Sequence, residues 1–433
     1  MRFSTPNKVA TCLACSLFFA RSLAAPDPSD VSKYNQTKGT ADFIKSAMLG
    51  SIRTSWEQGT AAGGILEWDD SEYSVFGSSP FTSNGQFPVD TLQLAYSAAV
   101  RKTPDGRLSQ NIGDALDGAA LDGASAGSAV LLGSFADTDS SRSSYWWNAA
   151  ASELNYVCRF FFYVSRSSSR PISTHPDSER CSPNEIGRHF PQSRQRSILV
   201  RPSPTFSVCI RQFYVCRADG VYMGFPFIAY YGGVTNNQTL LQIAYDQCRL
   251  YRDALILDGP TGKLWGHIYD DDNNTWIDQG IWGTGNAWAA LGIIRVAVTI
   301  QKTSFASSMT AQVSDLVSWV KEILDGELAA LTSQNLVPDY LTDGPSFGDA
   351  SSTGALASVA YRAATLWPDQ FGSNYTSTAA NMRDAVLGGI TNLGTVSPVV
   401  NPLVWNETGL LSTEAQAFSL MMFSGWRDYL GVS

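Results

Sequence analysis

Apolar residues recur every three to four positions along most of the chain, which is the period of an amphipathic α-helix. Clear examples are residues 41–52, 89–100, 145–157 and 239–257, where an apolar stripe alternates with polar positions. Residues 286–300 differ, because they are apolar almost all round. That pattern predicts a helix that is buried on every side.

Similar runs fill the second half of the chain, at residues 311–331, 351–366, 376–390 and from Thr413 onward. Small residues at 124–135 predict a closely packed helix, and Gln416 three residues after Thr413 is typical of a capping box. No block rich in strand patterns competes. About 350 residues outside two unusual segments leave room for about twelve helices. We therefore predict an all-α fold, an (α/α)6 barrel with a small-residue inner ring and its site in the loops at one end.

The first unusual segment is the N-terminus, residues 1–24. Arg2 and Lys8 are basic, residues 9–20 are apolar, and Ser22-Leu-Ala24 is a small-residue cleavage sequence. This order predicts a secretory signal peptide and a secreted, extracellular protein. Residues 25–39 form a polar lead-in, and the barrel domain is expected to span residues 40–431.

The second unusual segment is residues 158–216. It holds nine arginines, no lysine, three acidic residues and four of the seven cysteines: Cys158, Cys181, Cys209 and Cys216. It follows neither a helical nor a strand period, and such Arg/Ser/Pro-rich sequence buries little surface. We interpret it as foreign to the fold, through a retained intron or frame error, with a genuine surface insertion as the alternative. We expect the cysteines to mispair and the chain that carries this segment to be less active than one without it.

The acidic balance of the chain narrows its class of partner. A formal net charge of −9 and a pI near 4.9 argue against nucleic acid. The leader's apolar run is too short to cross a bilayer and no later run is long enough, so we expect no membrane partner. Five Asn-x-Ser/Thr sequences predict N-glycosylation, at Asn35, Asn237, Asn273, Asn374 and Asn406. The oligomeric state stays open.

Metal and cofactor motifs do not stand out. His267 is the one histidine outside residues 158–216, whereas a metal site needs several ligands at fixed spacing. Residues 270–272 start like a calcium loop but lack its later ligands. We expect neither metal nor cofactor, which leaves carboxylates as the groups for chemistry, as in sugar hydrolysis.

Aromatic and acidic residues gather between residues 217 and 291. Four tryptophans lie near Gly, Asp or Asn and are candidates for exposed loops: Trp265, Trp276, Trp282 and Trp288. Flat rings beside carboxylates suit a sugar ring, although most tryptophans are core residues. Asp219 and Asp122 each precede an apolar helical run. Each is either a helix N-cap or a catalytic carboxyl, and in the catalytic case apolar surroundings would raise the pKa of Asp219.

Five motifs, in order, resemble the unsaturated uronyl hydrolases of glycoside hydrolase families 105 and 88, the six-hairpin glycosidases, and most closely their secreted fungal members. The motifs are Ser55-Trp-Glu-Gln-Gly59, Ala218-Asp-Gly-Val-Tyr-Met-Gly224, Thr261-Gly-Lys-Leu-Trp-Gly-His267, Trp282-Gly-Thr-Gly-Asn-Ala-Trp288 and Asp349-Ala-Ser-Ser-Thr-Gly354. The resemblance covers about residues 40–430 apart from 158–216. It implies an (α/α)6 barrel and an oligosaccharide substrate that ends in an unsaturated uronic acid, the sugar left by lyases of pectin or related polymers.

The resemblance also implies residue roles. Asp219 would be the acid/base that protonates C4 before water adds at C5, and Asp122 would be the second carboxylate. The resemblance implies that the substrate is bound by His267, Trp282, Asn286 and Trp288, with Trp56 as a further wall. The hemiketal formed by hydration would then open and release the rest of the sugar.

Two positions depart from the family pattern. The family has Trp-Gly-Arg-Gly-Asn-Gly-Trp, whose arginine meets the substrate carboxylate, whereas this chain has Thr284 there and Ala287 in place of a glycine. A hydroxyl cannot make the charge-assisted fork of arginine. The family also has a His and a Trp shortly before the Asp219 position, and residues 207–218 contain neither. Two alternatives therefore stay open, a carbohydrate-binding protein without catalysis and a hydrolase of ordinary glycosides.

Overall fold

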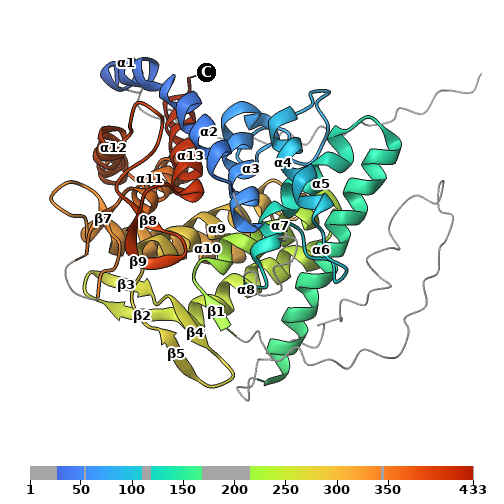
Figure 1. Cartoon of the computed structure of the whole chain (residues 1–433). Coiled ribbons are helices and arrows are strands. Elements are labelled where there is room, and N and C mark those ends of the chain that lie inside the picture. The colour runs from blue at the N-terminus through green and yellow to red at the C-terminus, as the bar shows by residue number, and fades with distance from the viewer. Residues whose placement is uncertain (1–26, 53–54, 110–118, 168–214, 343–345, 433) are drawn as a thin grey trace, which may run out of the picture.

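The computed structural model describes residues 27–52, 55–109, 119–167, 215–342 and 346–432. Helices dominate these residues and form two concentric layers (Figure 1). The outer helices are α2 (Thr40–Ser51), α4 (Val89–Val100), α6 (Ser140–Ser167), α8 (Gln238–Leu255), α10 (Thr310–Ala329) and α12 (Ser373–Gly388). The inner helices are α3 (Ser55–Asp69), α5 (Gly127–Ala136), α7 (Gly220–Val234), α9 (Gly283–Gln301), α11 (Ala350–Leu366) and α13 (Thr413–Leu430).

Outer and inner helices alternate along the chain. Neighbouring inner helices contact each other in the order α3, α5, α7, α9, α11, α13 and back to α3. Each outer helix packs on the inner helix that precedes it, and α2 closes the circle by packing on α13. This arrangement confirms the predicted (α/α)6 barrel. The helices expected from periodicity are all present, with ends displaced by a few residues except in α6, which ends ten residues later than expected.

The inner helices are buried because their sequences are apolar or small. In α9 every residue from Gly283 to Ile300 is buried, as its all-round apolar pattern predicts. Glycines allow the closest approaches: a Cβ on Gly292 of α9 would lie 2.6 Å from the carbonyl oxygen of Val221 in α7. One inner helix, α3, is missing from the sequence prediction. Its buried positions include Glu57, Gln58 and Glu67, so no apolar stripe marks it.

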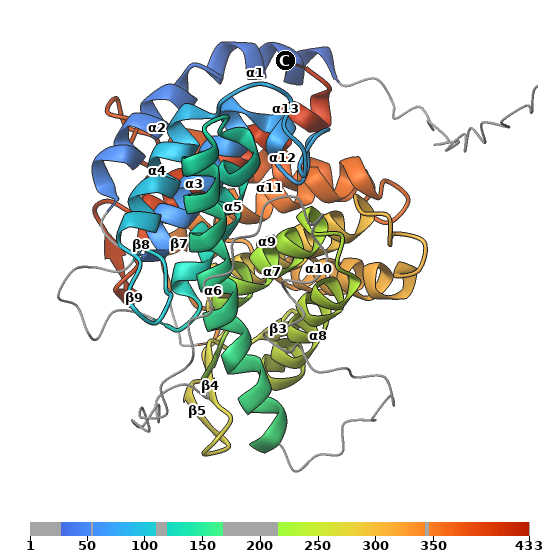
Figure 2. The ribbon, with the colours of Figure 1, turned by 90° about the vertical axis from the view of Figure 1, so that its right-hand side faces the viewer.

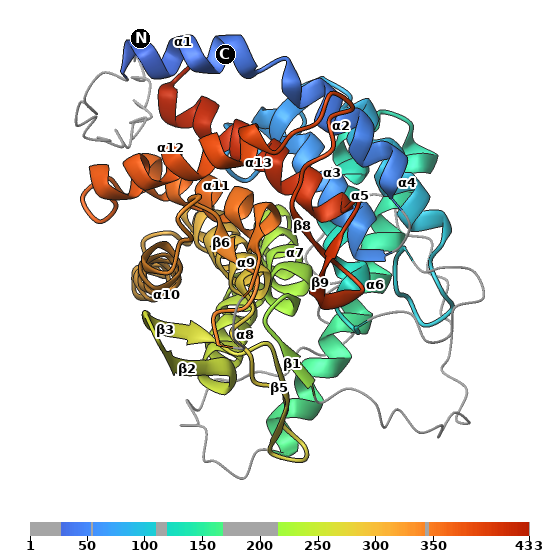
Figure 3. The same cartoon turned by 60° about the vertical axis from the view of Figure 1, so that its left-hand side comes forward.

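The polar lead-in contains a further helix, α1 (Pro28–Thr37). The Asp27 side chain caps it by accepting from the Ser29 backbone N–H at 2.8 Å. Tyr34 is buried and its ring lies 5.1 Å from that of Trp426 in α13, edge to face. The helix therefore packs against the barrel at the end from which the C-terminus emerges (Figure 3).

Short strands lie in the connections that lead from an outer helix into the next inner one. A three-stranded antiparallel sheet has the order β1 (Val215–Arg217), β4 (Ile268–Asp270), β5 (Thr275–Asp278). The remaining strands pair in twos: β2 (Ile256–Gly259) with β3 (Gly262–Trp265), β6 (Val337–Pro338) with β7 (Gly348–Asp349), and β8 (Val399–Asn401) with β9 (Val404–Gly409). Because every such connection enters an inner helix at its N-terminus, the strands gather at one end of the barrel (Figures 1 and 3).

Two single-turn 3-10 helices complete the description, η1 (Ser71–Tyr73) and η2 (Asp122–Ala126). The segment expected to be foreign to the fold joins it at both ends. Residues up to Ser167 continue the long helix α6 (Figure 2). Cys158 is buried, and β1 begins at Val215. Regular structure therefore extends into the expected segment from both sides, by nine residues after Cys158 and by Val215 and Cys216 at its other end. Residues 168–214, with Cys181 and Cys209, and the N-terminal residues 1–26 lie outside the described residues.

In the part of the chain that the structure describes, no helix is long and apolar enough to span a membrane. The described cysteines, Cys158, Cys216 and Cys248, form no disulfide with one another.

Candidate active site

Acidic residues mark the N-termini of five of the six inner helices. Glu57 lies in the first turn of α3, Asp122 begins η2 just before α5, and Asp219 lies at the N-cap position of α7. Asp349 caps α11 and Glu414 lies in the first turn of α13. All five carboxyl groups are buried. The positive ends of helix dipoles favour negative charge, so helix N-termini are favourable positions for carboxylates. We call these five residues the acidic ring.

Asp219 forms an ion pair at the entry of α7. Its two carboxylate oxygens accept from Nε and Nη2 of Arg217 at 3.1 and 3.0 Å, and it makes no capping hydrogen bond. Burial by itself opposes ionisation of Asp219, but Arg217 and His267 outweigh it and lower the pKa of the carboxyl below its ordinary value. The expectation of a raised pKa is therefore wrong, because no pattern in the sequence indicates that Arg217 folds back onto Asp219.

Arg217 connects Asp219 to two other groups of the site. Burial lowers its pKa, but Asp219 and Asp122 nearby overcome this and raise it above the ordinary value. The guanidinium also lies 5.2 Å from the centre of the Trp405 ring in β9. Arg217 is the last residue of β1, where it pairs with Ile268 of β4. Sequence reasoning passed over both Arg217 and Trp405. The first lies directly after the segment of foreign composition, and the second lies in a hairpin with no motif.

Asp122 is the second predicted carboxyl. It is buried at the start of η2, where its Oδ2 accepts from the backbone N–H of Ala119 at 3.1 Å. Its negative charge acts on Arg217, which places it on the same side of the acidic ring as Asp219. The two predicted carboxyl groups are therefore brought together through one guanidinium.

Glu414 differs from Asp219 in its environment. Burial, together with the negative charges of Asp349, Glu57 and Asp219, raises the pKa of Glu414 to about 8. Trp56 donates a hydrogen bond that only partly offsets this. Within the described residues, Oε1 of Glu414 has no hydrogen-bond partner. The group is protonated at neutral pH, which the sequence could not show because Glu414 read as part of a helix start. The cap of that helix is Ser412, not Thr413, and it bonds the Ala415 N–H at 3.2 Å.

His267 lies behind the acidic ring and is fully buried. Its Nδ1 lies 2.8 Å from Oδ2 of Asp278, which also accepts from the Tyr340 hydroxyl at 2.7 Å. Burial lowers the pKa of His267, and its hydrogen bond to Asp278 only partly opposes this, so the imidazole is neutral. With Asp278 as the acceptor, the proton sits on Nδ1. The ring lies 4.4 Å from Trp282 and 4.6 Å from Trp405, centre to centre.

These residues fall in a segment with a recognisable family pattern. Residues 212–328 match the model of Glycosyl Hydrolase Family 88. The family 88 segment contains Arg217, Asp219 and His267 and runs through α7, α8, α9 and most of α10. No curated protein matches the sequence.

Several solved structures have the same fold. A possible member of glycoside hydrolase family 105 from Salmonella enterica superposes with a TM-score of 0.57 and 13% identity, over 92% of this chain and 95% of that one. A family 105 glycoside hydrolase from C. acetobutylicum gives 0.58 and 12%, over 90% and 99%. An unsaturated glucuronyl hydrolase of Bacillus sp. GL1, described as responsible for the degradation of glycosaminoglycan, gives 0.57 and 13%, over 92% and 97%. The barrel is thus a six-hairpin glycosidase fold.

Within the family 88 segment, two predicted substrate-binding residues are buried by protein contacts. Trp288 is 1% exposed and packs between Tyr222 and Phe418, with ring centres at 4.7 and 4.4 Å. Asn286 is fully buried and connects β3 to α9. Its Oδ1 accepts from the Trp265 N–H at 2.9 Å, and its Nδ2 donates to the carbonyl of Trp265 at 3.0 Å. Their contact with a substrate stays a prediction.

Trp282 lies nearer the site than Trp288 but is also buried. Its Nε1 donates to Oδ1 of Asp339 at 3.1 Å. Burial and the negative charge of Asp349 raise the pKa of Asp339 to about 8. Thr284, at the position of the family arginine, is buried and donates to Oδ2 of Asp349 at 2.9 Å. By contrast, Trp56 and Trp405, which lie beside residues of the acidic ring, are only half-buried.

The interior below the acidic ring is narrow. A cavity of about 70 Å³ runs from Gly59 and Ser125 past Tyr222 to Glu67 and Arg295. This volume has room for a few water molecules but not for a sugar ring.

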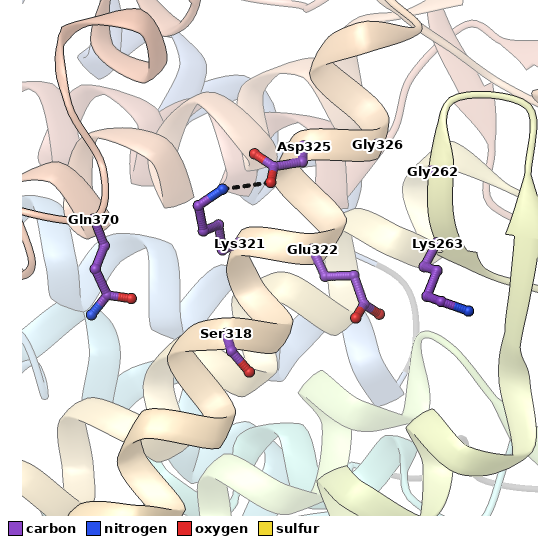
Figure 4. A pocket seen from close by; sticks show the side chains of 8 residues that line it. All are labelled: Gly262, Lys263, Ser318, Lys321, Glu322, Asp325, Gly326 and Gln370. Carbon is purple, nitrogen blue, oxygen red and sulfur yellow. Dashed lines mark hydrogen bonds and ion pairs between the residues drawn. The ribbon is translucent and has the colours of Figure 1, made fainter.

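A second hollow, of about 350 Å³, lies on the outside of the barrel between α10 and β3 (Figure 4). Its charged groups already have partners: Lys321 with Asp325 at 2.6 Å, Lys263 with Asp258 at 2.8 Å, and Glu322 with Arg252 at 2.8 Å. It is larger than the interior cavity but lies away from the acidic ring. Among the described residues, no group of three His, Cys, Asp or Glu side chains is arranged to hold a metal ion.

The predicted glycosylation positions lie mainly on the surface. Asn35, Asn273, Asn374 and Asn406 are exposed, whereas Asn237 is half-buried and caps α8 by accepting from the backbone N–H groups of Thr239 and Leu240.

Proposed function

We propose that the protein is a glycoside hydrolase that hydrates the C4=C5 double bond of an unsaturated uronyl residue at the non-reducing end of an oligosaccharide. The observation that carries the proposal is the pair of carboxyl groups in the acidic ring with opposite protonation at neutral pH. Asp219 is ionised beside Arg217, and Glu414 is protonated in its buried, acidic surroundings. Two carboxyl groups whose environments separate their pKa values are suited to act as base and acid in one reaction.

In the proposed reaction Glu414 delivers its proton to C4 of the double bond. The ionised Asp219 accepts a proton from the water whose oxygen bonds to C5. One molecule of water is thereby added across C4=C5, and Asp219 returns the proton to Glu414 through solvent. The product is a hemiketal at C5, which opens and releases the rest of the oligosaccharide. This assigns the two roles differently from the sequence prediction, in which Asp219 alone served as acid and base.

Two further observations support a carbohydrate substrate. The family 88 segment covers the Asp219 side of the acidic ring, and a solved structure of this fold, described as an unsaturated glucuronyl hydrolase variant with dGlcA-Glc-Rha-Glc, superposes with a TM-score of 0.56. Half-buried Trp56 and Trp405 offer ring faces to a sugar. We further propose that the substrates come from pectin or related wall polymers and that the protein is secreted. The support is the N-terminal signal sequence and the five glycosylation sequences.

The test is a screen of lyase products from rhamnogalacturonan, glucuronan and ulvan, followed by loss of the absorbance of the C4=C5 chromophore. Turnover of one of them is the expected outcome. Glycan binding without any loss of absorbance would instead favour a carbohydrate-binding protein. Release of saturated sugars from intact glycosides would favour an ordinary glycosidase.

A further inference from the structure

Arg217 has one edge of its guanidinium bound and another open. Nε and Nη2 face Asp219 side-on, and Nη1 takes no part in that pair. The Arg217 side chain is 26% exposed, against 12% for Asp219. A guanidinium carries five N–H donors in one plane and can hold two carboxylates at once, one on each edge. The open edge therefore has donors for a second anion.

The orientation of that open edge is fixed. The ring of Trp405 covers the flat face of the guanidinium at 5.2 Å, and His267 packs against Trp405 edge to face at 4.6 Å. The Asp219 pair holds the Nε end. With one face and one edge occupied, the guanidinium is pre-organised to bind through what remains.

Arg217 supplies the positive charge that an acidic ligand needs in this otherwise acidic site. The acidic ring repels anions, because Asp219, Asp122, Asp349 and Glu57 lie within it. The positive charge that acts on both Asp219 and His267 is that of Arg217. An anionic sugar entering this site gains its attraction at that guanidinium.

We propose that Arg217 binds the carboxylate of the substrate through the guanidinium edge that Asp219 leaves open. The inference rests on the proposed function, since an unsaturated uronyl residue carries its carboxylate on C5. Holding that carboxylate at Arg217 puts C5 and the adjacent C4 beside Asp219, which is bound to the same guanidinium. Arg217 thus selects acidic sugars and sets the distance between the double bond and the carboxylate that activates water.

The experiment compares binding of an unsaturated uronyl disaccharide with binding of its methyl ester, by calorimetry on Asp219→Asn protein, which is not expected to turn the ligand over. Adding Arg217→Gln should weaken binding of the acid about 10- to 100-fold, the range of charge-assisted hydrogen bonds, and leave the neutral ester nearly unchanged. Arg107→Gln, at a surface arginine that faces Asp105, is the matched control. Equal weakening for acid and ester would overturn the inference.

A second test uses the wild-type protein and therefore does not depend on whether a variant folds. It should turn over the acid with a KM at least about tenfold below that of the ester, and the preference should shrink as salt is raised. If the wild type hydrates the double bond but shows no preference for the acid, the inference fails and the proposed function stands. If it hydrates neither ligand, the proposed function fails.

Discussion

Asp219 and Glu414 show how neighbouring carboxyl groups can differ. Asp219 is buried but forms a bidentate ion pair with the Arg217 guanidinium. This ion pair lowers the pKa of the carboxyl by more than burial raises it. Glu414 is buried with one indole donor and three negatively charged neighbours, so its pKa is raised and it keeps its proton at neutral pH. The sequence presents both as acidic residues at helix starts. Only the position of Arg217, two residues before one and far from the other, separates their roles.

Asp219→Asn should lower kcat about 10²- to 10⁴-fold, because an amide cannot accept a proton from water. The side chain caps no helix, so the helix itself should persist. Circular dichroism and a chromophore assay measure the two effects. Asp325→Asn, in the Lys321 pair on the outer surface, should leave both unchanged. Wild-type activity in Asp219→Asn would exclude Asp219 from the chemistry.

The raised pKa of Glu414 predicts an alkaline limit to activity. A proton donor with a pKa of about 8 is protonated below that pH and deprotonated above it. We therefore expect kcat to fall as the pH rises through about 8. Asp219, with its lowered pKa, stays ionised down to acid pH and sets no limit near neutrality. Glu414→Gln should lose activity about 10²-fold or more at every pH. A flat profile from pH 7 to 10 would contradict this role.

At the scale of the element, the close approach of inner helices holds the acidic ring in place. Gly292 lets α9 lie directly on the backbone of Val221 and Tyr222, which follow Asp219 in the first turn of α7. An added Cβ at 2.6 Å from a backbone oxygen cannot be relieved by a rotamer change. Helix packing here positions the chemistry as well as the core.

Gly292→Ala should destabilise the protein by about 1 to 3 kcal/mol and reduce activity, since α7 must shift to make room. Gly50→Ala is the matched control: Gly50 lies in α2 with no atom near the new Cβ, and the change should stabilise by up to about 1 kcal/mol. Urea unfolding and the chromophore assay measure both variants. Similar effects from the two substitutions would show that backbone contact between α7 and α9 is unimportant.

The elements also show what sequence periodicity can predict. Amphipathic α8 and the wholly apolar α9 were recognisable because burial imposes a pattern on their residues. The inner helix α3 was not, since its buried positions include the carboxyl groups of Glu57 and Glu67, and Glu67 pairs with Arg295 of α9. Trp288 belongs to a motif that resembles a sugar site, but its ring packs into the barrel interior. Its burial depends on Tyr222 and Phe418, which no local pattern connects to it.

At the scale of the molecule, several buried carboxyl groups couple folding to pH. Burial raises the pKa of Glu153, Asp339 and Glu414 to about 8 each, against 4.5 or 3.8 ordinarily. The unfolded chain releases these protons at lower pH than the folded one. Their contribution to stability is therefore full below about pH 4 and is lost as the pH rises towards 8.

We expect the Tm to fall steadily from pH 5 to pH 8, with each such group contributing on the order of 1 to 4 kcal/mol across the window. Glu153→Gln should flatten part of this slope. Glu153 lies outside the acidic ring and accepts from the Leu108 N–H at 2.5 Å, a bond that an amide oxygen can keep. Thermal melts at intervals of one pH unit measure the slope. An equal slope in the variant and the wild type would contradict the linkage.

The end of the barrel opposite the acidic ring is sealed by charge. The Glu67 carboxylate binds both Arg295 and Arg362, all three are buried, and Arg362 also pairs with Asp428. Among the described residues, this buried cluster closes the far end of the barrel. Under the proposed function, an oligosaccharide would therefore enter only with its non-reducing end, and the product would leave by the same route. The rate would then follow the concentration of non-reducing ends and not the mass of polymer.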